Sequence, residues 1–275
     1  MSGRPVTTTE YRTSQTGGGT QKQFSQELRL ASRLDGSFNF ILGGFYLNSR
    51  GSGYVDTWTP ANRLSGAVSK FSTRLGQVES YAVFGEAYVD LAENLKLTGG
   101  LRYTHDKKHI ETASGLFALS PYFIGDADFD KLTGRAVLNW KPTVSFTEDT
   151  NIYLSFSRGF KSGGFNPGNN TIPVFESEAI DAYELGAKNT FMDGKGRLNL
   201  ALFNYEYSNL IVGNLVGTAV ANTNIPKSRV RGLEAELVYT PIEPLRLEAN
   251  LGLLNATVRS DFRSSDPSRG KDLFQ

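Results

Sequence analysis

Apolar side chains recur at every second position in about ten segments of this chain, each roughly 8 to 13 residues long. In the segment 79–90, for example, Tyr81, Val83 and Val89 share one face, whereas Glu86 and Asp90 lie on the other. Such alternation is the pattern of a strand with one apolar and one polar face. The segments are residues 24–31, 38–48, 79–90, 95–106, 131–141, 150–158, 179–191, 197–208, 228–239 and 245–258.

The connections between these segments alternate between short and long. Short ones carry turn-forming residues and lie near 34–36, 92–94, 142–149, 193–196 and 241–244; the long polar ones are 49–78, 107–130, 159–178 and 209–227. Short periplasmic turns and long extracellular loops are typical of barrels in an asymmetric outer membrane. We therefore predict an all-β fold: an antiparallel up-and-down transmembrane β-barrel segment of about ten strands. A soluble β-sandwich also alternates, but gives no reason for connections sorted by length.

Aromatic residues stand near both ends of the apolar faces. Two such bands match the girdles in which amphipathic rings lie at the lipid headgroups. The predicted membrane-girdle residues are Tyr81, Tyr103 and Tyr183 near the long connections, and Trp140, Phe191 and Tyr239 before the short ones.

The opposite faces of the predicted strands carry polar and charged residues. Because an open strand edge in hydrocarbon leaves peptide groups unsatisfied, spanning strands must close into a cylinder. Their polar faces then line a wide lumen that is wet or filled by a plug. The predicted lumen-facing residues are Glu86, Arg102, Arg135, Glu184, Lys188, Glu234 and Glu236.

Composition narrows the functional classes. The 29 basic and 28 acidic residues nearly cancel, which gives no basic surface for nucleic acid. The absence of cysteine excludes disulfides and thiolate metal sites. No apolar run of about 18 residues occurs, so a spanning helix is not expected, whereas a spanning strand needs only about 9–11 residues. The polar first 20 residues lack the features of a signal peptide.

Six short phrases occur in order along the chain. They are 24–30 (FSQELRL), 81–86 (YAVFGE), 101–104 (LRYT), 157–166 (SRGFKSGGFN), 183–188 (YELGAK) and 231–234 (RGLE). Together they resemble the barrel strands of TonB-dependent outer-membrane receptors, and the likeness covers most of residues 24–258. We accordingly divide the chain into a flexible polar leader (1–23), a barrel segment of such a receptor (24–259) and a truncated polar loop (260–275).

The resemblance implies a ligand-gated transporter in the outer membrane of a Gram-negative bacterium. In such a receptor a barrel of about 22 strands surrounds a plug, which is rearranged through an energised inner-membrane partner. The implied partners are outer-membrane lipid, the plug domain and TonB system, and a small-molecule ligand such as a ferric siderophore, haem, cobalamin or a carbohydrate. This sequence departs from a whole receptor in lacking a plug, a TonB-contacting segment, about half of the strands and the usual terminal aromatic residue. We therefore expect an internal barrel fragment.

Candidate chemical motifs are few. His105 and His109 lack further ligands for a metal site. The acidic positions 126, 128 and 130 lack the glycine and distal glutamate of a calcium loop. Glu234 and Glu236 have no nucleophile or oriented base beside them for acid–base catalysis. We predict no metal site, no cofactor and no enzymatic activity.

The segment 158–170 is the best candidate for ligand contact. Its glycines let backbone approach a ligand, and charged, aromatic and amide side chains lie among them. The candidate ligand-binding residues are Arg158, Lys161, Phe165 and Asn166. Arginine and lysine there suit an anionic ligand, although turn geometry alone also explains the glycines.

We thus expect ligand capture and import at the cell surface. The alternatives are a passive porin-like channel, which needs a constriction loop folded inward and no plug, a nonfunctional barrel fragment, and a soluble or structural β-meander.

Overall fold

The computed structural model describes residues 14–58, 68–116, 119, 121–166, 173–216 and 219–259. This part of the chain forms strands and turns without a helix. The strands are β1 (Ser14–Ala31), β2 (Phe38–Trp58), β3 (Ser69–Ala92), β4 (Leu95–Leu116), β5 (Phe123–Trp140), β6 (Asp149–Lys161), β7 (Gly164–Phe165), β8 (Val174–Phe175), β9 (Glu178–Phe191), β10 (Gly196–Val216), β11 (Ala219–Ile242) and β12 (Leu245–Val258).

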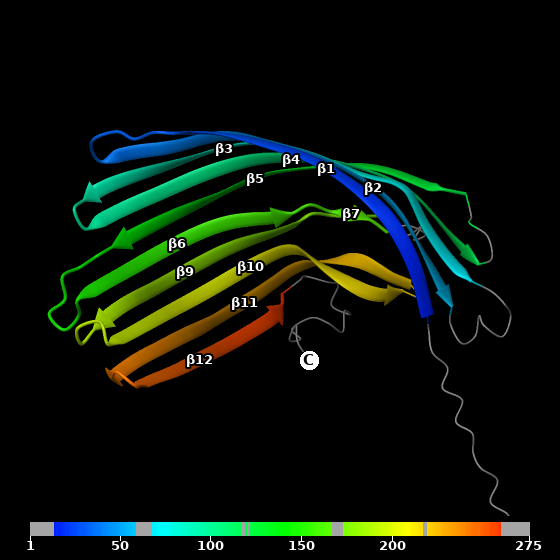
Figure 1. Cartoon of the computed structure of the whole chain (residues 1–275). Helices are drawn as coiled ribbons and strands as arrows, with labels where there is room; N and C mark the ends of the chain where they lie inside the picture. The colour runs from blue at the N-terminus through cyan, green and yellow to red at the C-terminus, as the bar shows by residue number, and fades with distance from the viewer. Residues whose placement is uncertain are drawn as a thin grey trace, which may run out of the picture.

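Ten of these strands form one antiparallel sheet. Its order is β1-β2-β3-β4-β5-β6-β9-β10-β11-β12, so each strand pairs with its neighbour in sequence except where the small β7–β8 hairpin intervenes. The sheet is curved, and in Figure 1 the short connections gather at its left end while the long hairpins extend to the right. The predicted all-β, up-and-down architecture is confirmed.

The strands extend much further than the hydrophobic pattern predicts. The sequence pattern places loops at 49–78, 107–130 and 209–227, which is wrong for most of these residues, since β2, β4 and β10 run on to Trp58, Leu116 and Val216. These extensions mix polar and apolar residues without regular alternation, and that of β10 carries Leu210, Ile211 and Val212 in succession. Their ladder hydrogen bonds form regardless of side chain, as where Gln77 faces His109.

The predicted leader is also partly wrong. Strand β1 begins at Ser14 rather than at residue 24, and the triple glycine within it pairs with β2, Gly17 opposite Val55. Glycine is a weak strand former, which is why residues 14–23 lack a strand signal. Residues 1–13, and the predicted terminal loop 260–275, lie outside the described residues.

The two faces of the sheet differ in exposure. Val83 and Leu101, cross-strand diagonal neighbours on one face, are each 64% exposed, whereas Ala82 and Thr104 on the other face are 5% and 6% exposed. Side chains converge on the inside of a curved sheet and diverge on its outside. The face of Val83 and Leu101 is therefore the convex face, and that of Ala82 and Thr104 the concave face.

Aromatic rings cover glycines on the concave face. The ring of Tyr153 on β6 lies over Gly186 of β9, so that a Cβ added at Gly186 would overlap ring atoms. The same relation joins Phe84 to Gly43 and Phe203 to Gly232. Such cross-strand pairs fix the register and fill the space that glycine leaves.

Replacing Gly186 by valine should destabilise the sheet by about 1–3 kcal/mol, because the new side chain displaces the Tyr153 ring. The matched control is Gly99→Val, since a Cβ at Gly99 meets nothing within 4 Å; its effect should stay within about 0.5 kcal/mol. Urea unfolding of the detergent-solubilised protein measures both. Equal midpoints for the two variants would contradict the ring–glycine role.

Candidate functional site

Side chains on the convex face of β1 to β5 lie in rows that cross the strands. One row is mainly apolar and consists of Leu28, Gly44, Val83, Tyr103 and Leu132. The next row toward the long hairpins is amphipathic and consists of Gln26, Tyr46, Tyr81, His105 and Asp130. Beyond it lie Phe24, Asn48, Glu79, Lys107 and Asp128, and then Lys22, Arg50, Gln77, His109 and Asp126. The face thus changes from apolar to charged over three steps, roughly 20 Å along a strand.

The border between the apolar and charged parts runs obliquely to the rows. The row that contains Leu42 and Leu101 continues onto the later strands as charged residues. These continuing residues are Arg158, Asp181, Glu206 and Arg229. A row that is apolar at one end and charged at the other is what strands tilted to a membrane normal require.

All six predicted girdle residues lie on the convex face, near the borders of the apolar band. On the side of the long hairpins they are Tyr81, Tyr103 and Tyr183, and beside the short connections Trp140, Phe191 and Tyr239. Tyr81, Tyr103, Trp140 and Tyr183 are 44–48% exposed. A position between apolar and polar surface is where tyrosine and tryptophan rings are enriched in membrane proteins.

All seven predicted lumen-facing residues share the concave face. The guanidinium of Arg135 donates two hydrogen bonds to the carboxylate of Glu86, of 2.6 and 2.8 Å. Gly100 stands between them in the ladder, and a Cβ there would lie 3.0 Å from the Glu86 carboxylate. The missing side chain therefore lets the ion pair form across a whole strand.

Four of the other five predicted lumen-facing charges also have partners in the wall. The hydroxyl of Tyr153 donates to Glu184 at 2.5 Å, and the Nζ of Lys188 lies 5.8 Å from the centre of the Tyr153 ring. Asn199 donates to Glu236 at 3.4 Å. The guanidinium of Arg102 lies 5.3 Å from the Phe84 ring. These contacts hold the charges in fixed positions on the concave face.

The four candidate ligand-binding residues do not form one group. Arg158 lies on the convex face and donates two 2.5 Å hydrogen bonds to Asp181. Lys161, three positions on, is exposed at the end of β6 on the concave side of the ladder. The structure therefore separates Arg158 from the other three residues.

Phe165 and Asn166 belong to the β7–β8 hairpin and hold it against the sheet. The amide of Asn166 donates to the Asn222 carbonyl at 2.7 Å and accepts from the Asn222 amide at 2.8 Å. The side chain of Asn224 likewise accepts from the backbone N–H of Glu176 at 2.9 Å and donates to its carbonyl at 3.0 Å. The hairpin is thereby fastened to β11, four positions along the sheet from β5.

The hairpin reaches the other side of the concave face as well. Lys108 of β4 donates to the carbonyl of Gly163 at 2.6 Å, and the Phe165 ring meets the Phe123 ring of β5 edge-on at 6.4 Å. The connection thus spans the concave face at the end where the long hairpins lie. The pattern of the sequence missed Lys108, Asn222 and Asn224 because no local signal marks a contact made by a folded-back loop.

Two cations, Lys108 and Lys161, are close enough at this hairpin to affect each other electrostatically. Burial lowers the pKa of Lys108, and the nearby charge of Lys161 acts in the same direction, whereas Asp106 opposes both. Lys108 lies beyond the apolar band, next to the row of His109. An anion placed between Lys108 and Lys161 would relieve their mutual repulsion.

His109 lies in the charged part of the convex face, beyond the apolar band. Its Nδ1 is 2.7 Å from Asp126 and its Nε2 is 3.3 Å from Glu111, which also binds Arg74. The Asp126 carboxylate raises the pKa of His109, and Glu111 adds to this. Within the described ranges, no cluster of three or more histidine, cysteine and acidic residues could hold a metal ion, and no helix is long and apolar enough to cross a membrane.

A curved up-and-down sheet with an apolar, aromatic-bordered convex face and a charged concave face defines a segment of a transmembrane β-barrel. A family model described as "TonB dependent receptor-like, beta-barrel" matches residues 2–275. The chain belongs to this family, whose members are receptors and transporters rather than enzymes.

Several solved structures share the fold. The ferric yersiniabactin uptake receptor FyuA from Yersinia pestis has a TM-score of 0.72 and 18% identity, over 90% of this chain and 37% of that one. The copper transporter OprC has a TM-score of 0.67 and 15% identity, over 90% and 39%. The alcaligin outer-membrane receptor FauA from Bordetella pertussis has a TM-score of 0.56 and 15% identity, over 89% and 40%. The chain spans about two fifths of each of these structures.

The titration of His109 provides a test of its surroundings. Because the Asp126 carboxylate stabilises the imidazolium, the midpoint should lie above the ordinary value of about 6.5. The attraction between Asp126 and protonated His109 is complete at a pH below the ordinary pKa of histidine. It is lost as the pH rises through the raised pKa of His109. NMR of the histidine ring measures the midpoint, and Asp126→Asn should lower it. An unchanged midpoint in Asp126→Asn would contradict the contact.

Proposed function

We propose that this chain forms part of the wall of an outer-membrane receptor that imports a scarce small-molecule ligand with energy from the TonB system. The observation that carries the proposal is the match of the receptor-barrel family model to nearly the whole chain. A ferric siderophore is the cargo class we favour, because a receptor for ferric yersiniabactin and one for alcaligin are among the similar structures.

In this proposal the convex face meets outer-membrane lipid and the long hairpins lie at the cell surface. Both edges of the sheet, β1 and β12, would pair with further strands of the same barrel, because unpaired peptide groups in hydrocarbon cost several kcal/mol each. The charged concave face would contact the plug. Fixed ion pairs such as Glu86–Arg135 give that contact a defined pattern of charge.

The ligand would meet the barrel at the β7–β8 hairpin. Lys161 and Lys108 provide two positive charges on the concave side, which suits an anionic ligand such as a siderophore with carboxylate or phenolate groups. Phe165 and Asn166 would act by shaping the hairpin through Phe123 and Asn222. Arg158, paired with Asp181 on the convex face, would contribute to the rim.

A passive porin-like channel is the second candidate. The observation in its favour is the same hairpin, since a segment that spans the concave face would act as a constriction. A nonfunctional barrel fragment is the third reading. The three candidate functions differ in whether uptake occurs and in whether it requires energy.

Uptake distinguishes the candidates. The natural full-length protein that carries this chain should restore saturable uptake of one ferric siderophore, from a labelled panel, to a host that lacks its own receptors. An uncoupler should abolish that uptake, because the TonB system draws on the inner-membrane gradient. Non-saturable uptake that survives the uncoupler would favour the porin, and no uptake of any substrate would favour the nonfunctional fragment.

Lys161→Gln should weaken binding of an anionic ligand by about 5-fold, because one charged contact contributes about 1 kcal/mol at an exposed site. Lys141→Gln, in the short connection at the opposite end of the sheet, is the matched control and should bind as the wild type does. Equilibrium binding to the purified receptor measures both. Equal affinities for the wild type and Lys161→Gln would exclude Lys161 as a ligand contact.

A further inference from the structure

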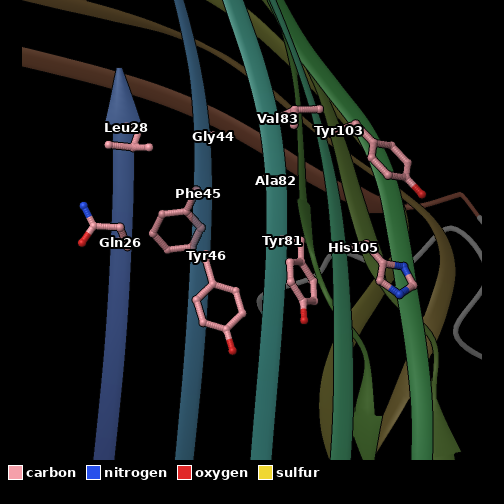
Figure 2. A pocket seen from close by; sticks show the side chains of 10 residues that line it. All are labelled: Gln26, Leu28, Gly44, Phe45, Tyr46, Tyr81, Ala82, Val83, Tyr103 and His105. Carbon is pink, nitrogen blue, oxygen red and sulfur yellow. The ribbon is translucent and has the colours of Figure 1, made fainter. Parts of the chain in front are cut away.

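The convex face carries a hollow over β1 to β4. It has a volume of about 570 Å³, and the convex-face residues that line it include Leu28, Gly44, Tyr46, Tyr81, Val83 and Tyr103. Figure 2 shows Leu28 and Val83 on the strands either side of Gly44, with Tyr46 and Tyr81 next to each other below them. The hollow thus opens on the face that the receptor turns toward lipid.

The hollow exists because Gly44 has no side chain. Its ladder partners are Leu28 on β1 and Val83 on β3, so an apolar row is interrupted at its middle. A Cβ at Gly44 would come no nearer than 3.9 Å to any atom, the carbonyl of Ala82. Neither neighbouring atoms nor a positive φ requires glycine here. The space is therefore free for an apolar group from outside the chain.

Fixed tyrosines form the outer lip of the hollow. The hydroxyls of Tyr46 and Tyr81 both donate to Oε1 of Glu79, at 3.0 and 2.6 Å, and their ring centres lie 5.1 Å apart. The two rings therefore stand as a rigid wall between the apolar row and the charged rows. A long apolar group that enters the hollow would pass along these rings.

Three cations lie beyond the tyrosines. Lys22 and Arg50 are direct cross-strand partners, both exposed, and Lys107 lies two rows from Gly44. Across the part of the chain that the structure describes, none of the three makes an ion pair within 4.0 Å. Lys107 stands between two carboxylates, Glu79 on β3 and Asp128 on β5, and Glu79 also attracts Arg50 at longer range, so the basic area is centred on the Lys22–Arg50 pair. Like charges directly opposite each other on two strands are destabilising. A bound anion would remove that cost.

The distance between the hollow at Gly44 and the Lys22–Arg50 pair indicates which class of ligand fits both. Arg50 lies six residues from Gly44, roughly 20 Å along the strand, which is about the length of an extended fatty acyl chain. An apolar slot at one end and a pair of cations at the other match an acyl chain with an anionic headgroup, and phosphate is the anion that arginine and lysine bind best together. Binding of a partner protein would not require the apolar slot and the cation pair to lie one acyl-chain length apart.

We propose that the hollow at Gly44 and the Lys22–Arg50 pair form a binding site for a phosphorylated, multiply acylated lipid of the outer leaflet. One acyl chain lies in the hollow, and the headgroup phosphate lies between Lys22 and Arg50, with Lys107 at its side. The site rests on the outer-membrane placement proposed above. It does not depend on which ligand the receptor imports.

The test uses the natural full-length protein that carries this chain, expressed in an outer membrane and purified in mild detergent. Native mass spectrometry counts the phosphorylated lipid retained per protein. The wild type should retain about one such lipid, and Gly44→Leu and the double variant Lys22→Gln/Arg50→Gln should each retain at least 5-fold less. Gly99→Leu is the matched control, because Gly99 lies on the same face, with no atom within 4 Å of its Cβ, and should retain as much as the wild type.

Retention by both variants at the wild-type level, or a wild type that retains none, would overturn the proposal. Retention of a zwitterionic phospholipid in place of the phosphorylated lipid would also overturn it. Normal retention by a protein that fails in the uptake assay would contradict the proposed import function alone. Recovery of the wild type without detergent would contradict both.

Discussion

The structure depends on the need of every peptide group in a bilayer to find a hydrogen-bond partner within the protein. An up-and-down sheet meets this need for each strand that has two neighbours, and the ladder continues unbroken from β1 to β12. The connection between β6 and β9 leaves this ladder, because its β7–β8 hairpin pairs only with itself. Side-chain amides bind this connection to β11 instead. Asn166 makes two hydrogen bonds to the backbone of Asn222, and Asn224 makes two to the backbone of Glu176.

Strand tilt explains how the two faces are divided. Ladder partners lie in rows perpendicular to the strands, whereas membrane depth changes along each row of a tilted sheet. Leu101 and Arg158 are therefore two steps apart in one row and yet belong to different environments. The same tilt places Tyr183 as the upper aromatic on β9, while Tyr81 has that place on β3, three rows higher.

Alternation predicts the parts of the fold that touch lipid and fails beyond them. The faces of Tyr81, Trp140 and Glu86 follow from period-two patterns, because one side of each strand must be apolar. Strand extensions such as the one that carries His109 have no such constraint, and only backbone pairing defines them. Arg158 lies an even number of residues from Leu154 and Phe156, so the alternating pattern already places it on the same, convex face. The Asn166–Asn222 contact joins residues 56 positions apart and has no local signal.

Glycine has a different role on each face of this thin wall. On the concave face the neighbours use the space, as where Gly100 admits the Glu86–Arg135 pair and Gly186 lies under Tyr153. On the convex face nothing in the chain fills the space at Gly44 or Gly99. Lipid solvates any such gap, but the ladder partners of Gly99 are two alanines, Ala87 and Ala136, whereas at Gly44 two ordered tyrosines and the Lys22–Arg50 pair stand in line with the gap. The difference between a solvated gap and a binding site lies in that ordered polar edge, because only the edge discriminates among lipids.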